Sequence, residues 1–304
     1  MIIDIHSHLG DILNPNGKEL IGKKGIKKEI EFDIISVLEA GLHESLDGID
    51  SEWSIEQIEI AIIEASRARN FTASLENMRI SMDEAGVDKT ACMPIPPHLT
   101  FDDLKAAQVL DPGIIPFTGV DYTREYDVEA ALIGDVKQGA KGMKLHPIIQ
   151  QIPLNSPETL RTVEAFAVHN LPILFHCGTS EYYLNDEKAT NQNPAFGAIK
   201  YAAELVAAFP GVSFIAGHAG LFEYQEVISL LKKFKNVWVD ISFQASDNIK
   251  ELIAVFGPER VMYASDWPFG ERIPAIQNVK KACEGDSALE NRIFHENAAE
   301  LLDI

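Results

Sequence analysis

The sequence predicts an α/β fold, a (β/α)8 or TIM barrel, formed as a single domain over residues 1–304 with a long helical insertion after the first strand. Two observations lead to this prediction. Short apolar runs typical of buried strands alternate along the chain with segments of helical periodicity. Polar residues that bind metals stand at the ends of several of these runs, where barrel enzymes keep their chemistry. Because each helical crossover covers the outer face of a parallel sheet, such units close most simply into a barrel.

The expected strands are apolar, β-branched runs bounded by glycine, proline or polar residues. The first starts in the opening Met-Ile-Ile-Asp-Ile and ends in His6-Ser7-His8. The others are expected at residues 89–94, 114–120, 142–146, 172–176, 212–218, 237–242 and 260–265. Between them, residues 71–85 carry one apolar helical face that Gly86 would end with a left-handed cap. Ser156 and Pro157 predict the N-cap and first turn of another helix, and residues 287–303 predict a closing helix.

A long insertion, about residues 10–70, separates the first strand from the helix at 71–85. It is expected to contain helical segments around residues 28–42 and 54–68. A loop of this length at the active-site end of a barrel is typical of a lid or specificity element. A peripheral subdomain or an oligomer contact explains it equally well, so both interpretations stay open.

The composition restricts the partners. A net charge of −20 argues against nucleic acid, because phosphate binding needs a basic surface. No apolar stretch approaches the length that spans a bilayer, and the first strand leaves no room for a signal peptide, so no membrane partner and a cytoplasmic location are expected. The three cysteines lack metal-ligand spacing and are expected to be reduced. A homodimer or a higher homo-oligomer is compatible with the sequence.

Five polar side chains at strand ends predict a metal site. His6 and His8 are two apart on an extended chain, so they point to the same side. His176, His218 and Asp266 each end an apolar run far downstream. The carboxyl ends of barrel strands meet at one face, and imidazoles with a carboxylate suit Zn²⁺ or a similar divalent ion.

The same stretches resemble a known family. They are Asp4-Ile5-His6-Ser7-His8, Met82-Asp83-Glu84-Ala85-Gly86-Val87-Asp88, Leu171-Pro172-Ile173-Leu174-Phe175-His176, Gly217-His218-Ala219-Gly220, Ser265-Asp266-Trp267-Pro268 and His295-Glu296-Asn297-Ala298. Together they resemble the amidohydrolase-related family of the metal-dependent hydrolase superfamily, the branch that also contains aromatic-acid decarboxylases. The resemblance covers almost the whole chain except the insertion. It is specific to the branch and not to one reaction.

The resemblance implies that His6, His8, His176 and Asp266 hold one divalent metal ion, Zn²⁺ or alternatively Mn²⁺, with His218 beside the metal-bound water. Some members of the superfamily hold two metals bridged by a carboxylated lysine on the fourth strand. Lys144 stands on that strand, but a second metal is not expected here.

These residues support more than one reaction. Asp266 would accept a proton from a metal-activated water that His218 orients, which predicts a metal-dependent hydrolase of an amide, lactone or ester bond in a small molecule. The alternative is a non-oxidative decarboxylase of a small aromatic or unsaturated carboxylic acid, which needs a lysine or arginine to bind the carboxylate. A metal-dependent nuclease or phosphoesterase is less favoured, because the chain is acidic and the fourth strand ends without a glutamate ligand.

Four further residues are expected to contact the substrate. Lys144 and His146 share one side of the fourth strand, and Lys144 offers a point charge to an anionic substrate. A structural role at the barrel rim is the alternative for both. Asp240 ends the seventh strand, and Trp267 follows Asp266. Asp4 has the same parity as the two histidines of its strand and is expected either to support them from below or to lie in the barrel floor.

Overall fold

The computed structural model describes residues 1–41 and 53–304, so part of the insertion, residues 42–52, lies outside the described residues. The strands are β1 Ile3–Ser7, β2 Lys89–Cys92, β3 Ile114–Pro116, β4 Thr118–Gly119, β5 Met143–Leu145, β6 Ile173–Phe175, β7 Phe214–Ala216, β8 Val237–Asp240 and β9 Val261–Met262. The α-helices are α1 Ile34–Gly41, α2 Ile55–Asn70, α3 Leu75–Ala85, α4 Phe101–Leu110, α5 Val128–Gln138, α6 Pro157–Ala167, α7 Asn185–Asn191, α8 Ile199–Ala208, α9 Tyr224–Leu231, α10 Ser246–Phe256, α11 Arg272–Cys283, α12 Ser287–Asn291 and α13 Asn297–Leu302. Short helices of other types are η1 Gly17–Leu20, η2 Pro194–Gly197, η3 Gly217–Glu223, η4 Pro258–Arg260 and the π-helical η5 Arg292–Glu296.

All the strand pairs are parallel and follow the order of the sequence. One sheet has the order β1-β2-β3 and the other runs from β4 to β9. The sheets are joined because β3 and β4 are two halves of one strand that changes partner at Phe117. The Phe117 amide donates to the Cys92 carbonyl of β2 at 3.0 Å, and the Thr118 amide donates to the Gly142 carbonyl beside β5 at 2.8 Å.

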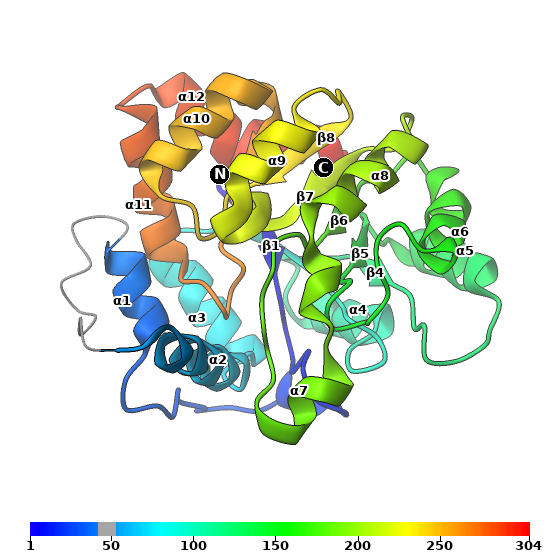
Figure 1. The fold of residues 1–304 in the computed structure, drawn as a ribbon, viewed down its shortest axis with the longest axis horizontal. Coiled ribbons are helices and arrows are strands. Elements are labelled where there is room, and N and C mark those ends of the chain that lie inside the picture. The colour runs from blue at the N-terminus through cyan, green and yellow to red at the C-terminus, as the bar shows by residue number, and fades with distance from the viewer. Residues whose placement is uncertain (42–52) are drawn as a thin grey trace.

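Backbone hydrogen bonds between the first and last strands close the sheet on itself. The Ile5 amide donates to the Tyr263 carbonyl at 3.1 Å, and the His8 amide donates to the Trp267 carbonyl at 2.6 Å. Helices surround these strands, as Figure 1 shows. The predicted barrel is therefore confirmed, although most of its strands are shorter than predicted, β7 and β9 most of all.

The helix boundaries follow the capping residues. Gly86 ends α3 with a φ of 69°, a left-handed value that costs glycine little. The Ser156 hydroxyl accepts the Thr159 amide at 3.1 Å and Pro157 begins α6, as predicted. The closing segment differs from the single helix that was predicted, because the π-helical turn η5 separates α12 from α13.

An irregularity in β1 changes the direction of its side chains. Ile3 and Ile5 share an interior cluster with Leu174 of β6 and Met262 of β9, whereas Asp4 forms an ion pair with a residue of the outer helix α11. The pairing register with β2 shifts between Asp4 and Ser7. A bulge of this kind redirects the residues that follow it, so Asp4 does not share a side with the histidines as strict alternation predicted.

The described part of the insertion lies at the carboxyl ends of the strands. Ile34 and Ile35 of α1 form a small buried cluster with Ala65 of α2, and Phe243, just beyond β8, packs against it. In the described ranges, no helix has both the length and the apolar character needed to cross a membrane.

Candidate metal centre

His6 and His8 present the same ring nitrogen to one point. The His6 Nδ1 lies 2.8 Å from the Asp240 carboxylate, and the His8 Nδ1 lies 3.0 Å from the Met93 carbonyl. Both partners are acceptors, so each Nδ1 carries the proton and each Nε2 keeps its lone pair. Burial, reinforced by the charge of Lys144, holds the pKa of both histidines well below the usual range. Two neutral imidazoles are therefore ready to act as ligands.

The Asp266 carboxylate completes this group. Its Oδ1 lies 3.4 Å from the Nε2 of His6 and 3.4 Å from the Nε2 of His8. This oxygen is buried and accepts no hydrogen bond from the described residues. Burial also raises the pKa of Asp266 well above its usual value, against the opposing charge of Lys144. An orphaned carboxylate oxygen beside two lone pairs is a costly arrangement that a divalent cation would satisfy, so these residues fit a metal ion.

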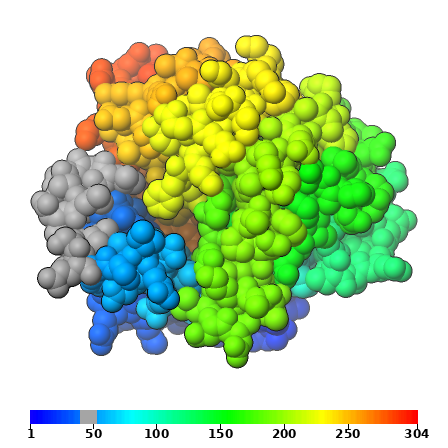
Figure 2. All heavy atoms as spheres, in the orientation of Figure 1, coloured from blue at the N-terminus to red at the C-terminus, as the bar shows by residue number. Residues whose placement is uncertain are grey.

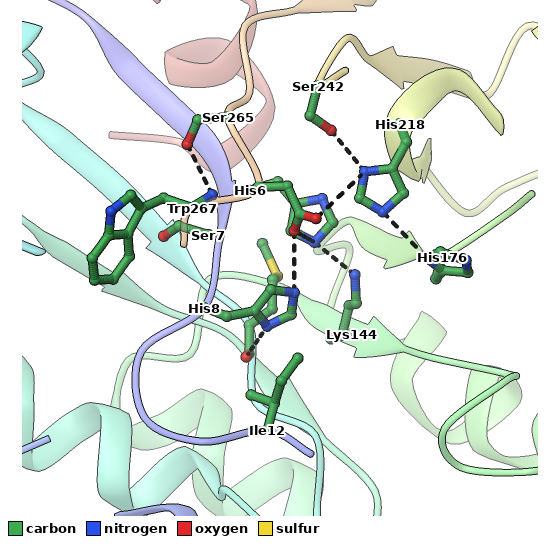
Figure 3. A network of polar contacts seen from close by, with 12 residues as sticks. His6, Ser7, His8, Ile12, Lys144, His176, His218, Ser242, Ser265 and Trp267 are labelled. Atoms are coloured by element: carbon green, nitrogen blue, oxygen red, sulfur yellow. Dashed lines mark hydrogen bonds and ion pairs between the residues drawn. The ribbon is translucent and has the colours of Figure 1, made fainter. Parts of the chain in front are cut away.

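His218 adds a second possible ligand group that overlaps the first. Ligand atoms of His6, His218 and Asp240 lie within 4.8 Å of one another, as do those of His6, His8 and Asp266. The His218 Nδ1 lies 2.7 Å from the Ser242 hydroxyl and 3.9 Å from Asp266 Oδ2. Figure 3 shows His218, His6 and His8 turned toward one another. The structure therefore places His218 beside His6 and Asp266.

His176 reaches the group through His218. Its Nδ1 lies 3.1 Å from the His218 Nε2, while its own Nε2 lies 3.0 Å from the Gly178 carbonyl. Burial lowers its pKa to about 3, so the ring is neutral. His146 stacks on it with ring centroids 4.3 Å apart. The structure thus brings His176 to the edge of the predicted ligand set, one imidazole away from Asp266.

The backbone brings the loops of His176 and His218 into direct contact. Gly178 and Gly220 both have left-handed φ values, of 98° and 85°. A Cβ built on Gly178 would lie only 2.5 Å from the Gly220 carbonyl oxygen. His218 itself has a φ of 58°, in a left-handed stretch that continues to Leu221. Only glycine at position 178 allows this approach.

Lys144 places a cation inside the site. Its side chain is 1% exposed and its Nζ lies 2.7 Å from the His6 Nε2. Burial lowers its pKa to about 8, although Asp266 and Asp240 favour the charged form. Lys144 and His146 both lie within the site, as their shared parity predicted. The structure therefore supplies a positive charge beside the candidate ligands.

Two of the expected substrate contacts face elsewhere. Asp240 is fully buried; its Oδ2 faces His6 and its Oδ1 accepts the Ser242 hydroxyl at 2.6 Å, so it orients ligands below the site. The Trp267 ring points away from the imidazoles, as Figure 3 shows, and lies 5.0 Å from the Arg272 guanidinium. The left-handed backbone of Asp266, with a φ of 57°, turns the chain so that Trp267 faces outward.

Three aromatic rings border the site, and the strand pattern did not identify two of them. Tyr182 lies 5.4 Å from the His146 ring and 6.4 Å from the Phe269 ring. Phe269 in turn lies 5.9 Å from His8, and Phe243 lies 5.8 Å from His218. The sequence predicts Phe269, just past Asp266, as an apolar wall or a cap of the rim, whereas Tyr182 and Phe243 belong to loops without periodicity. Figure 2 shows the surface hollowed between α2, the chain around α7, and the segment of η3 and α9.

The family model described as Amidohydrolase matches residues 3–304. No curated protein sequence matches the chain. Among solved structures, it is similar to 5-carboxyvanillate decarboxylase from Sphingomonas paucimobilis (14% identity, 100% of this chain and 99% of that chain, TM-score 0.63). It is also similar to the 5-carboxyvanillate decarboxylase from Novosphingobium aromaticivorans complexed with manganese and a nitrobenzoic acid (17% identity, 100% of this chain and 96% of that chain, TM-score 0.63). A third similar structure is a probable 2-pyrone-4,6-dicarboxylic acid hydrolase from Acinetobacter baumannii (15% identity, 100% of this chain and 99% of that chain, TM-score 0.59).

At these identities the structural matches show the shared fold alone, whereas the match to the family model extends over nearly the whole chain. The protein is therefore an enzyme of the amidohydrolase family, a hydrolase or a carboxy-lyase.

Proposed function

We propose that the protein is a metal-dependent, non-oxidative decarboxylase of a small aromatic or unsaturated carboxylic acid. The observation that carries the proposal is the position of Lys144, whose ammonium lies beside the candidate metal ligands. A decarboxylase must hold an anionic substrate at the metal, and a buried cation does so strongly. This replaces hydrolysis, the main sequence-based prediction, by its stated alternative.

Four arginines that could bind a carboxylate in the same way are engaged elsewhere. Arg272 pairs with Asp4 outside the barrel interior, and Arg69 is surrounded by carboxylates of the insertion. Arg124 is largely exposed and pairs with Asp121. Arg67 of α2 pairs with Glu187 of α7 at 2.7 Å. Lys144 is the cation, among the described residues, that shares the site with the imidazoles.

The rings around the site suit a planar substrate. Tyr182 and Phe269 form one wall, and an aromatic or conjugated acid gains from edge and face contacts with such rings. Two of the similar solved structures are decarboxylases of an aromatic acid, and one of these contains manganese. The third similar structure is described as a probable hydrolase of a dicarboxylic acid, so hydrolysis remains the second candidate.

We further propose one divalent metal ion, zinc or manganese, held by His6, His8 and Asp266 with His176 and His218 on its other side. When bound, such an ion supplies Lewis-acid stabilisation of negative charge on the substrate. Lys144 binds the substrate carboxylate. Asp266 or His218 delivers a proton to the carbon that bears this group, the bond to the carboxylate then breaks, and its electron pair stays on the carbon as carbon dioxide leaves.

A metal-reconstituted substrate screen tests this function. We expect carbon dioxide from at least one hydroxy-aromatic or unsaturated carboxylic acid, about one equivalent of metal per chain, and loss of turnover on chelation. Elemental analysis and carbon dioxide release measure these. Release of acid from a lactone or amide, without carbon dioxide from any acid, would assign the protein to the hydrolases instead.

Substitution of Lys144 by methionine should weaken substrate binding. A hydrogen bond to a charged group contributes about 1.5–3 kcal/mol, so KM should rise roughly 10- to 100-fold. Lys141→Met is the matched control, because the Lys141 amine bonds the Leu302 and Asp303 carbonyls at the opposite end of β5. Steady-state kinetics with metal content measured in parallel decide the case. An unchanged KM in fully metallated Lys144→Met would remove Lys144 from substrate binding.

A further inference from the structure

Arg69 connects the insertion to the loop that follows Asp266. It lies near the end of α2, its side chain is 2% exposed, and all three of its nitrogens donate to partners. Its Nη1 donates to the Phe269 carbonyl at 2.6 Å and to the Glu39 carboxylate at 3.1 Å. Its Nε donates to Asp33 at 2.9 Å, and its Nη2 donates to Ser36 at 2.8 Å. One side chain thus joins α2, the start of α1 and the loop after β9.

Glu39 holds the same loop from the other side. One of its oxygens accepts both terminal nitrogens of Arg69, and the other accepts the Glu271 backbone amide at 2.8 Å. Burial raises the pKa of Glu39 to about 7, even though the charge of Arg69 works against this. The loop of residues 269–271 is therefore fixed at its Phe269 carbonyl and its Glu271 amide by two buried residues of the insertion.

The segments held in this way carry the aromatic wall of the site. The Phe269 ring lies between His8 and Tyr182, at 5.9 Å and 6.4 Å. Phe243 packs against the apolar cluster of α1 and α2 and also lies 5.8 Å from His218. The insertion therefore contacts two residues of this wall, through the main-chain carbonyl of Phe269 and the side chain of Phe243, without contributing a ligand itself.

We propose that Arg69 is a specificity-determining positioning residue, through which the insertion sets the space between the Phe269 ring and the metal-binding histidines. It acts through Phe269 and touches neither the ligands nor the reacting atoms. The choice of substrate in the test rests on the proposed function, but the positioning of the loop does not. This interpretation favours a specificity element over a peripheral subdomain for the described part of the insertion.

The network requires a guanidinium. The planar arginine guanidinium has N–H groups that donate at once to a carbonyl on one side and to carboxylates on the other. The lysine ammonium is a point charge with three donors and does not match this geometry. An apolar replacement would leave Asp33 and Glu39 without their cation in a buried place, so α1 and the loop would separate. We expect Arg69→Lys to behave more like Arg69→Met than like the wild type.

The first experiment compares two substrates that differ in one bulky substituent next to the carboxylate. In Arg69→Met and Arg69→Lys, the ratio of their kcat/KM values should change roughly tenfold toward the bulkier acid, because small shifts of an apolar wall change discrimination by about this factor. Metal content should stay unchanged. Glu39→Gln, which keeps Arg69 and the packing, is the variant to use if the arginine variants fail to fold. Arg79→Met is the control, since Arg79 of α3 pairs with Asp83 and Asp111 away from the site.

The second experiment needs no substrate. Hydrogen exchange of a peptide covering residues 264–273 should quicken in Arg69→Met and Glu39→Gln and stay at the wild-type rate in Arg79→Met. If the wild type decarboxylates nothing, the proposed function fails while this measurement still tests the positioning role. Unaltered exchange in Arg69→Met overturns the inference. A lower melting temperature with an unaltered substrate ratio would also overturn it, because that result describes a residue with a structural role only.

Discussion

Asp266→Asn is expected to lose turnover by roughly 10²- to 10⁴-fold while keeping part of its bound metal. The Asp266 Oδ1 lies 3.4 Å from two ligand nitrogens, and a carboxamide oxygen at the same place remains a ligand, although a weaker one. A carboxamide has no proton to give or take at neutral pH, so the proton-transfer step is removed. Elemental analysis and single-turnover kinetics at saturating metal separate the two effects.

Asp135→Asn is the matched control for this change. Asp135 is a half-buried carboxylate of α5 that accepts the Thr118 hydroxyl, and a carboxamide can accept the same hydrogen bond. It should leave both metal content and rate near the wild-type values. Near-normal turnover in metallated Asp266→Asn would contradict the role given to Asp266 and would identify His218 as the proton donor.

Arg272→Met should lower the free energy of unfolding by about 3–5 kcal/mol, the usual cost of leaving a buried charge without its partner. Arg272 begins α11 and is almost fully buried, with its Nε 3.2 Å from the Asp4 carboxylate. It also donates to the Ser81 hydroxyl at 2.9 Å. Urea denaturation monitored by fluorescence measures the loss of stability. Arg292→Met is the control: Arg292 pairs with Glu296 and Glu300 at the surface, so its replacement should change the free energy of unfolding little.

The pH dependence of this loss follows from Asp4. Burial already raises the pKa of Asp4 above its usual value while Arg272 lowers it, so removing the arginine raises that pKa further. A carboxyl whose pKa is raised in the folded state costs no stability below its unfolded-state pKa. The cost grows as the pH rises from that value to the folded-state pKa and is constant above it. The deficit of Arg272→Met should therefore shrink as the pH falls, and Asp4→Asn/Arg272→Met should recover part of it. A deficit independent of pH would show that lost packing, and not the charge, is responsible.

The sequence predicted the barrel and the elements that carry the site because burial imposes a simple period on strands. His6, His176, His218 and Asp266 were found because each follows a short apolar run, and parallel closure brings the ends of such runs to one face. Helix ends were predictable where a cap is local, as at Gly86 and Ser156. These features depend on interactions within a few residues or on one global rule.

What could not be predicted depends on backbone conformations without a sequence period. The register shift in β1 turned Asp4 outward, and the left-handed backbone at Asp266 turned the Trp267 ring away from the site. Tyr182 and Phe243 stand on irregular loops. The Arg69 network joins residues that are up to 232 positions apart, and no spacing rule identifies such contacts. The proposal of decarboxylation rests on Lys144, whose parity predicted the direction of its side chain but not its neighbours.

The contact between Gly178 and Gly220 has a consequence for how this enzyme can diverge. On that side of the centre, the main chain at Gly178 packs directly against the main chain at Gly220. Substitution of neighbouring side chains therefore cannot change the distance between the His176 and His218 loops. On the opposite side, Phe269 is held by ionic side chains that single substitutions can alter. We therefore expect related proteins to keep one flank of the centre invariant and to acquire new substrates by remodelling the other.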